Sequence, residues 1–230
     1  MAFNSYKKFS KANNVKKEKK PYSEINPHSV EAPVMRNKNI IITSIDPGIV
    51  NCGIYVSAYN TENNTHKSIY LQKLVFNTSD NHYLDSFKQL EDLEEKFNLF
   101  SKSHYIVIES QMTVNYDLVR MGQHLISYFL TRLKDRGNRP LLIEINSQAK
   151  TKLLKCPVRG NKYEYKKWCI QKAIDFLKER DNFEEEKNYL FALENKGKKD
   201  DMSDAVCQYY AFLEILLGEC DRPTLPVKRY

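Results

Sequence analysis

Residues 41–55, IITSIDPGIVNCGIY, place a charge at the end of a run of apolar residues. The isoleucines before Asp46 predict a buried strand, the Pro-Gly pair after it predicts a turn, and a second apolar run begins at Gly53. A carboxylate at the end of a buried strand costs free energy unless something pairs with it. Asp46 is therefore a candidate functional residue, although bracing the Pro-Gly turn would be a purely structural role.

Outward from this stretch, the pattern predicts an α/β domain. Alternating or continuous apolar runs predict strands over 40–46, 52–60, 68–77, 104–110 and 139–146. Helical spacing of apolar residues predicts helices over 83–100, 115–137, 165–181 and 202–218. The first three strands have short links and should be antiparallel, whereas the last two are reached through helices and could lie parallel to the first. This order predicts one five-stranded mixed sheet flanked by helices.

The basic charge is concentrated at the N-terminus. Residues 1–38 hold nine Lys or Arg and three Glu, a net +6 of the +7 carried by all 230 residues. They lack apolar periodicity, so we expect a disordered basic arm that touches nucleic acid, acts as a nuclear address or keeps the chain soluble. The folded domain is predicted to span 39–218, with a C-terminal tail over 219–230.

Composition excludes several classes of protein. The longest apolar runs, 40–42 and 212–217, are far too short to cross a bilayer, so no membrane association is expected, and no apolar stretch near the N-terminus predicts a secretory signal. The five cysteines are scattered without a CxxC pair, which argues against a disulfide framework or a structural zinc site. A reducing, intracellular compartment fits this pattern.

Three further carboxylates join Asp46. Glu109 ends the apolar strand over 104–110, and if this strand is a parallel neighbour of the first, both acids emerge at the same end of the sheet. Asp201 and Asp204 are three residues apart at the start of a helix and share one face. Singly, each acid could be a turn, cap or surface residue, but together they predict a site for a hard cation such as Mg²⁺ or Mn²⁺.

The motifs around these acids resemble a known family. SIDPGIVNCGIY, IVIES and DDMSDAV are similar to the acidic motifs of RuvC-like Holliday-junction resolvases, of the type found in poxviruses and other large DNA viruses. The segment INSQAK resembles the region where poxvirus-type resolvases carry a functional lysine, with Lys150 as the best match and Lys152 as the alternative. The resemblance covers about residues 40–217, leaves Asp200 outside the last motif, and implies a ribonuclease H-like fold.

The resemblance also implies an activity. It suggests a metal-dependent, structure-selective endonuclease that resolves four-way DNA junctions by paired symmetric incisions, in DNA recombination and in resolution of viral genome concatemers. The implied catalytic residues are Asp46, Glu109, Lys150, Asp201 and Asp204. The four acids would hold two Mg²⁺ ions, with Mn²⁺ able to substitute and Asp46 bridging both. A viral chain would act at a cytoplasmic replication site in the host cell or in the nucleus.

A basic segment offers a surface for the DNA phosphates. Residues 147–172 contain eight Lys or Arg against Glu164 alone. The candidate DNA-binding residues are Lys152, Lys155, Arg159, Lys162, Lys166 and Lys167. Trp168 lies among them but is expected to pack on the core rather than stack on a base.

The helix over 115–137 has two apolar faces. One contains Leu118, Met121, Leu125 and Phe129, and the other contains Val119, Ile126, Leu130 and Leu133. The second face predicts a two-fold homodimer, or else burial within one chain under the arm or the tail.

Other functions stay open at this stage. The same fold would suit a ribonuclease H or a broader branched-DNA or flap nuclease, and a protein with a relic site would bind branched DNA without cutting it. An actin-like phosphotransferase, whose phosphate loop the Asp-Pro-Gly stretch loosely echoes, would need a second domain that the 230 residues do not provide.

Overall fold

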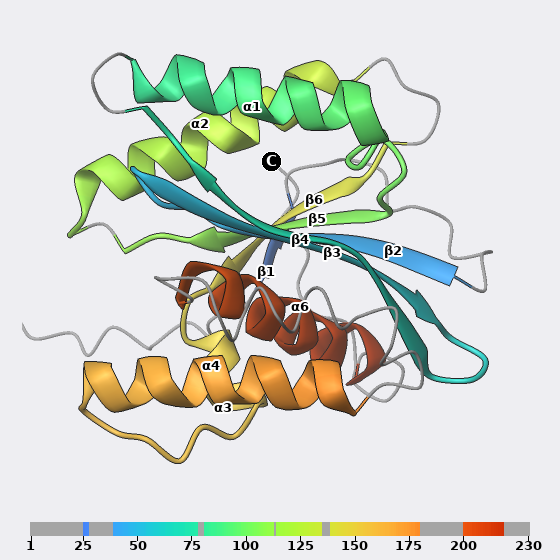
Figure 1. The fold of residues 1–230 in the computed structure, drawn as a ribbon, viewed down its shortest axis with the longest axis vertical. Coiled ribbons are helices and arrows are strands. Elements are labelled where there is room, and N and C mark those ends of the chain that lie inside the picture. Colours follow the sequence, from blue (N-terminus) through green and yellow to red (C-terminus); the bar gives the residue numbers. More distant parts are fainter. Residues whose placement is uncertain are drawn as a thin grey trace, which may run out of the picture.

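A mixed sheet forms the middle layer of the protein (Figure 1). The computed structural model describes residues 25–27, 39–77, 81–112, 114–134, 139–179 and 200–218. Its strands are β1 (Ile25–Pro27), β2 (Asn39–Asp46), β3 (Asn51–Asn60), β4 (Thr65–Val75), β5 (Tyr105–Ser110) and β6 (Leu141–Asn146). They are arranged in the order β1-β6-β5-β2-β3-β4.

The five predicted strands are confirmed, with the predicted directions. β2, β3 and β4 form an antiparallel meander, and β5 pairs in parallel with both β2 and β6. The prediction of a disordered arm is wrong at β1, whose three residues pair antiparallel with β6 and add a sixth strand. The remainder of the arm and the tail over 219–230 lie outside the described residues.

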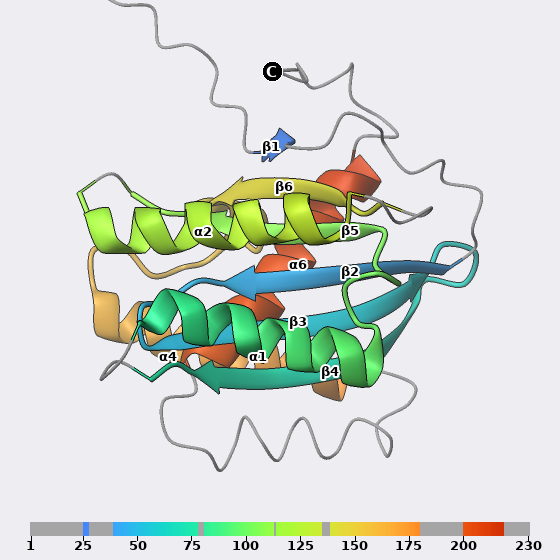
Figure 2. The same cartoon turned by 90° about the horizontal axis from the view of Figure 1, so that it is seen from above.

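Helices cover both faces of the sheet. The helices are α1 (His82–Phe97), α2 (Tyr116–Arg132), α3 (Ala149–Leu153), α4 (Lys162–Lys178) and α6 (Asp200–Gly218). α1 and α2 lie on one face, while α6, α3 and α4 lie on the other (Figures 1 and 2). α6 contacts both the sheet and α4, which explains why its apolar residues surround it rather than form one stripe. Within the described ranges, none of these helices is long and apolar enough to span a membrane.

The helix starts follow from the sequence. Asn81, Asn115 and Asn161 precede α1, α2 and α4, and each side chain accepts hydrogen bonds from backbone N–H groups of the first turn. Asparagine is among the preferred residues for this capping position because it satisfies N–H groups that the helix leaves unpaired. The end predicted for α2 at Gly137 lies outside the described residues.

The alternation of side chains along β2 and β5 decides which face the candidate acids share. Ile42 packs in the core under α6, and Ile45 packs in the core under α1 and α2. Because alternate residues of a strand point to the same face, Asp46 shares the α6 face with Ile42. In β5, Val107 belongs to the same core as Ile42, so Glu109 also points toward α6.

The second apolar face of α2 is partly buried inside the chain. Ile126 and Leu133 are both only 4% exposed and pack in the core that contains α1 residues such as Leu90, whereas Leu130 is 42% exposed. Two of the four apolar positions are thus buried within one chain, whereas Val119 is half-buried and Leu130 exposed, so the homodimer stays a prediction. α1 packs on another side of α2, where Phe87 contacts His124 and Tyr128.

A close approach of α6 to β3 depends on Gly53. A Cβ atom at this position would lie 2.0 Å from the carbonyl oxygen of Asp201 and 2.6 Å from its carbonyl carbon. Gly53 is the cross-strand partner of Asp46, so the absence of a side chain lets the start of α6 approach the end of β2. The glycine shortly after the Asp-Pro-Gly turn thus serves helix packing rather than a turn.

We predict that Gly53→Ala will destabilise the protein by about 1–3 kcal/mol, the usual cost of overpacking a core. Gly122→Ala is the matched control, since its nearest neighbour would be the Gln111 Cγ at 3.9 Å. In the interior of α2, alanine should be neutral or stabilise by up to about 1 kcal/mol. Urea unfolding followed by circular dichroism measures both, and equal stabilities for the two variants would show that α6 does not depend on Gly53.

Candidate active site

The five side chains singled out by the sequence lie together at one end of the sheet. Ile45 and Ile108 are register partners, so that Asp46 and Glu109 follow side by side at the ends of β2 and β5. α6 begins at this end and carries Asp201 and Asp204.

Lys150 joins the acids from α3, the short helix after β6. Its ammonium nitrogen lies 2.5 Å from Glu109 Oε2 and 2.8 Å from Asp204 Oδ1. It is only 4% exposed, whereas Lys152, two residues along, is exposed. Of the two lysines that the sequence offered, Lys150 is therefore the one that contacts the acid cluster.

Burial and charge together determine how the cluster ionises. Burial, followed by the negative charge of Glu109, raises the pKa of Asp46 well above its usual range, and the Lys150 ammonium opposes this only in part. Burial and then the neighbouring Asp200 also raise the pKa of Asp201. Both carboxyl groups thus resist ionisation until more positive charge is nearby.

The lysine responds in the opposite way. Burial alone would lower the pKa of Lys150, but the surrounding carboxylates, led by Asp204 and Glu109, outweigh it and raise the pKa well above its usual value. Lys150 therefore stays charged and neutralises part of a cluster with four acids.

The donor set suits a hard cation, although Lys150 at present holds two of the acids. Within the described residues, Asp201 Oδ2 is buried without a hydrogen-bond partner, while Glu109 Oε2 contacts the Lys150 ammonium. Within the described ranges, no three His, Cys, Asp or Glu side chains are arranged to hold one ion. Unpaired, buried carboxylate oxygens are costly unless a cation satisfies them, so the residues fit Mg²⁺ or Mn²⁺ by chemistry.

Sequence reasoning missed other residues around the cluster. Lys73 of β4 is the register partner of Gly53, and its positive charge partly offsets the rise in the pKa of Asp201. Cys169 of α4 points its thiol at Asp204 Oδ1, with the sulfur 3.3 Å away. Register across the meander could have placed Lys73 beside Asp46 and Gly53, but no sequence signal distinguishes Cys169 from an ordinary core cysteine.

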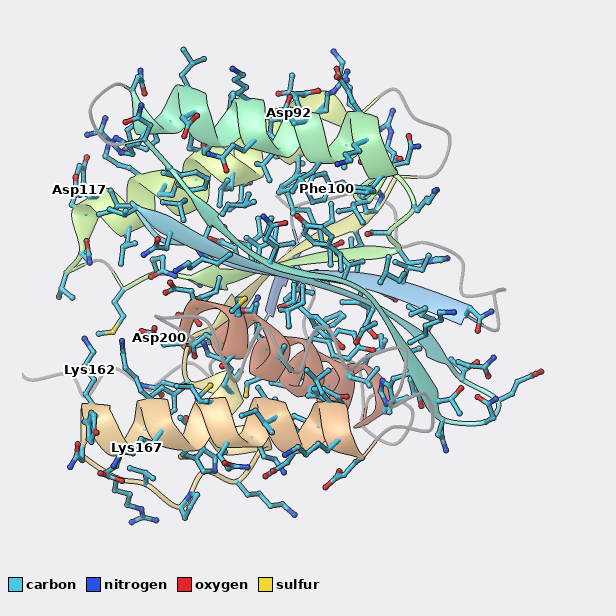
Figure 3. All side chains as sticks on the ribbon, in the orientation of Figure 1. Asp92, Phe100, Asp117, Lys162, Lys167 and Asp200 are labelled. Atoms are coloured by element: carbon cyan, nitrogen blue, oxygen red, sulfur yellow. The ribbon has the colours of Figure 1, made fainter. Side chains whose placement is uncertain are left out.

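The candidate DNA-binding residues lie on the α6 side of the sheet. Figure 3 shows Lys162, Lys167 and Asp200 on this side, with Asp92 and Asp117 across the sheet. The exposed members of the predicted set are Lys152, Lys155, Arg159, Lys162 and Lys167. Lys166 is half-buried and forms an ion pair with Asp200.

The expectation for Trp168 is confirmed. Its side chain is half-buried against the core under α6, and its ring stacks on Tyr165 with centroids 5.9 Å apart.

The fold defined by this sheet and its helices is the ribonuclease H-like fold of RuvC-like resolvases, as the resemblance of the motifs implied. Fowlpox virus resolvase in complex with Holliday junction DNA matches with a TM-score of 0.53 and 20% identity, over 77% of this chain and 99% of that one. RuvC of Thermus thermophilus in complex with its Holliday junction substrate matches with a TM-score of 0.51 and 9% identity, over 77% and 96%.

Sequence comparison adds a viral relative. Uncharacterized protein 170L of Invertebrate iridescent virus 6 is 29% identical in an alignment of 147 residues that covers 55% of this chain. The match spans 57% of the length of that relative. No protein-family model matches the chain.

We predict that Lys150→Met will destabilise the metal-free protein by about 3–5 kcal/mol, because it leaves buried carboxylates without their cation. Lys152→Met, two residues along and exposed, should change stability by less than about 0.5 kcal/mol. Denaturant unfolding in a chelator measures both. Equal effects would show that the ammonium of Lys150 contributes no more than a surface charge.

Proposed function

We propose that this protein is a metal-dependent, structure-selective endonuclease that resolves four-way DNA junctions by paired incisions. One observation carries the proposal: Asp46, Glu109, Lys150, Asp201 and Asp204 converge at one end of the sheet. They do so on a fold that also occurs in proteins solved with Holliday junction DNA, the fowlpox virus resolvase and Thermus thermophilus RuvC.

The four carboxylates would hold the metal. In the proposed arrangement Asp46 of β2 would lie between Glu109 of β5 on one side and Asp201 and Asp204 of α6 on the other. Two Mg²⁺ ions, or Mn²⁺ in their place, would supply an activated water and charge stabilisation for the leaving oxygen. Their charge would also favour ionisation of Asp46 and Asp201, whose pKa values burial raises.

Lys150 has a role of its own in the proposal. Its ammonium stays protonated beside Glu109 and Asp204. A fixed positive charge at this place can attract the scissile phosphate and stabilise the negative charge that develops during phosphodiester cleavage. It also limits the mutual repulsion of the acids before substrate arrives.

The basic residues at the same side of the sheet would hold the DNA backbone. Exposed Lys162 and Lys167 of α4, together with Lys152, Lys155 and Arg159 before it, can neutralise phosphates and release their counterions. Such contacts carry little sequence information, which suits an enzyme that selects a branched shape.

We include a homodimer in the proposal because the substrate needs one. A four-way junction must be cut on two strands at symmetric positions, and the described residues of one chain form a single acid cluster. A two-fold dimer presents two such clusters in one encounter. Because a relative occurs in an iridescent virus, we extend the proposal to viral DNA recombination and the resolution of replicated genome concatemers.

The test of this function is an incision assay with Mg²⁺ on a synthetic four-way junction, beside linear duplex, a flap and an RNA–DNA hybrid. We expect symmetric nicks in two opposing strands of the junction and little cleavage of the duplex. Preferred cleavage of the flap or of the hybrid would instead favour a flap nuclease or a ribonuclease H. Tight junction binding without any cleavage would favour a non-catalytic branched-DNA-binding protein.

We predict that Asp46→Asn and Glu109→Gln will each lower the junction-cleavage rate by at least about 100-fold, since even outer partners of metal ligands contribute 10–100-fold. Junction affinity, measured by fluorescence anisotropy, should persist or improve because less negative charge faces the phosphates. Asp117→Asn on α2, across the sheet, is the control and should cut normally. Near-normal cleavage by both site variants would remove the proposed metal site.

A further inference from the structure

One buried side chain connects the helix that carries two of the acids to both strands that carry the others. Gln208 lies on α6, four residues after Asp204, and is fully buried. Its side-chain nitrogen donates hydrogen bonds to the backbone carbonyl of Ile45, 3.1 Å away, and to that of Val107, 3.0 Å away. Ile45 directly precedes Asp46 in β2, and Val107 lies two residues before Glu109 in β5.

The two hydrogen bonds fix what apolar packing leaves free. On either side of Gln208 along α6, Ala205 and Phe212 contribute apolar contacts to the same core. Such contacts hold the helix at a distance from the sheet but permit it to slide or rotate at little cost, because they are non-directional. Hydrogen bonds weaken steeply with misalignment, so two from one amide to two strands define both position and rotation.

The chemistry also fixes which way the amide points. Both partners are carbonyl oxygens, which only accept, so the NH₂ group must face them. Gln208 Oε1 is then buried without a hydrogen-bond partner in the described structure. A buried amide with an unpaired oxygen is a poor choice for stability alone, since leaving such a group unsatisfied costs free energy.

We propose that Gln208 is a positioning residue that sets α6 so that Asp201 and Asp204 face Asp46 and Glu109 at the spacing a divalent cation requires. This inference rests on the metal site proposed above and adds a residue outside the acid cluster to it. Gln208 would not touch the ion or the DNA, and its effect on metal binding would pass through the backbone of the helix and the strands.

The test compares Gln208→Met with Tyr209→Phe on the full chain. Methionine keeps the length of the side chain but donates nothing to the carbonyls. The control removes a hydroxyl from the next residue of α6, which bonds to His66 Nδ1 at 3.1 Å, away from the acids. Both should lower the melting temperature. Mn²⁺ affinity, measured with Mn²⁺ alone by electron paramagnetic resonance, separates them.

We expect Gln208→Met to raise the dissociation constant for Mn²⁺ by about 10-fold or more, as for other partners that orient metal ligands. Tyr209→Phe should leave it unchanged. The Mn²⁺ concentration for half-maximal junction cleavage should rise in parallel for Gln208→Met, while the KM for the junction stays constant. Wild-type Mn²⁺ affinity in Gln208→Met would overturn the inference.

A second variant keeps the test decisive if Gln208→Met does not fold. Gln208→Asn keeps the amide but is one methylene shorter, so that it cannot reach both carbonyls, and it should weaken Mn²⁺ binding as well. If neither variant folds, Gln208 is a structural core residue and the positioning role is wrong. If the wild type itself binds no Mn²⁺, the metal site fails first, and that result is distinct from wild-type affinity in the variants.

Discussion

Four carboxylates gathered at one buried end of a sheet repel one another, and the rest of the structure has to hold them there. Repulsion between like charges a few ångströms apart reaches several kcal/mol wherever water is excluded. Two features oppose it: the Lys150 ammonium against Glu109 and Asp204, and the N-terminal end of α6, whose helix dipole favours the acids of its first turns. The packing of α6 on β2, β3 and β5 therefore stabilises the fold and also determines whether a site exists.

The same arrangement links packing to chemistry. Burial makes Asp46 and Asp201 harder to ionise, and a cluster in this condition gains most from a divalent cation. Close contact between Gly53 and Asp201, the amide of Gln208 and the pleat of β2 all act on the distance between the acids of the strands and those of the helix. A change in any of them should weaken metal binding even though the ligand residues themselves are unchanged.

Much of this could be predicted because strong local signals coincide with the fold. Apolar runs that end in Asp46 and Glu109, and a helix that starts beside Asp201 and Asp204, determine strand, helix and site together.

Other features could not be predicted, because their sequence signals are weak. β1 is three residues long, too short for a period to emerge, and its stability comes from pairing with β6. The second face of α2 looked unpartnered because the spacing of apolar residues cannot show that Ile126 and Leu133 are buried within the chain. The motif favours Lys150 and leaves Lys152 as the alternative, and only the turn of α3 separates the buried lysine from the exposed one. Gln208 carries no motif at all, since its importance depends on which carbonyls lie opposite.

The central claim is that the acids of β2, β5 and α6 form one cation site. Crystals grown with Mn²⁺ and measured at the manganese absorption edge would test it most directly. We expect anomalous density among Asp46, Glu109, Asp201 and Asp204, with the Lys150 ammonium displaced from at least one of its two carboxylates. Absence of manganese from this cluster at saturating Mn²⁺, with Lys150 still between Glu109 and Asp204, would contradict it.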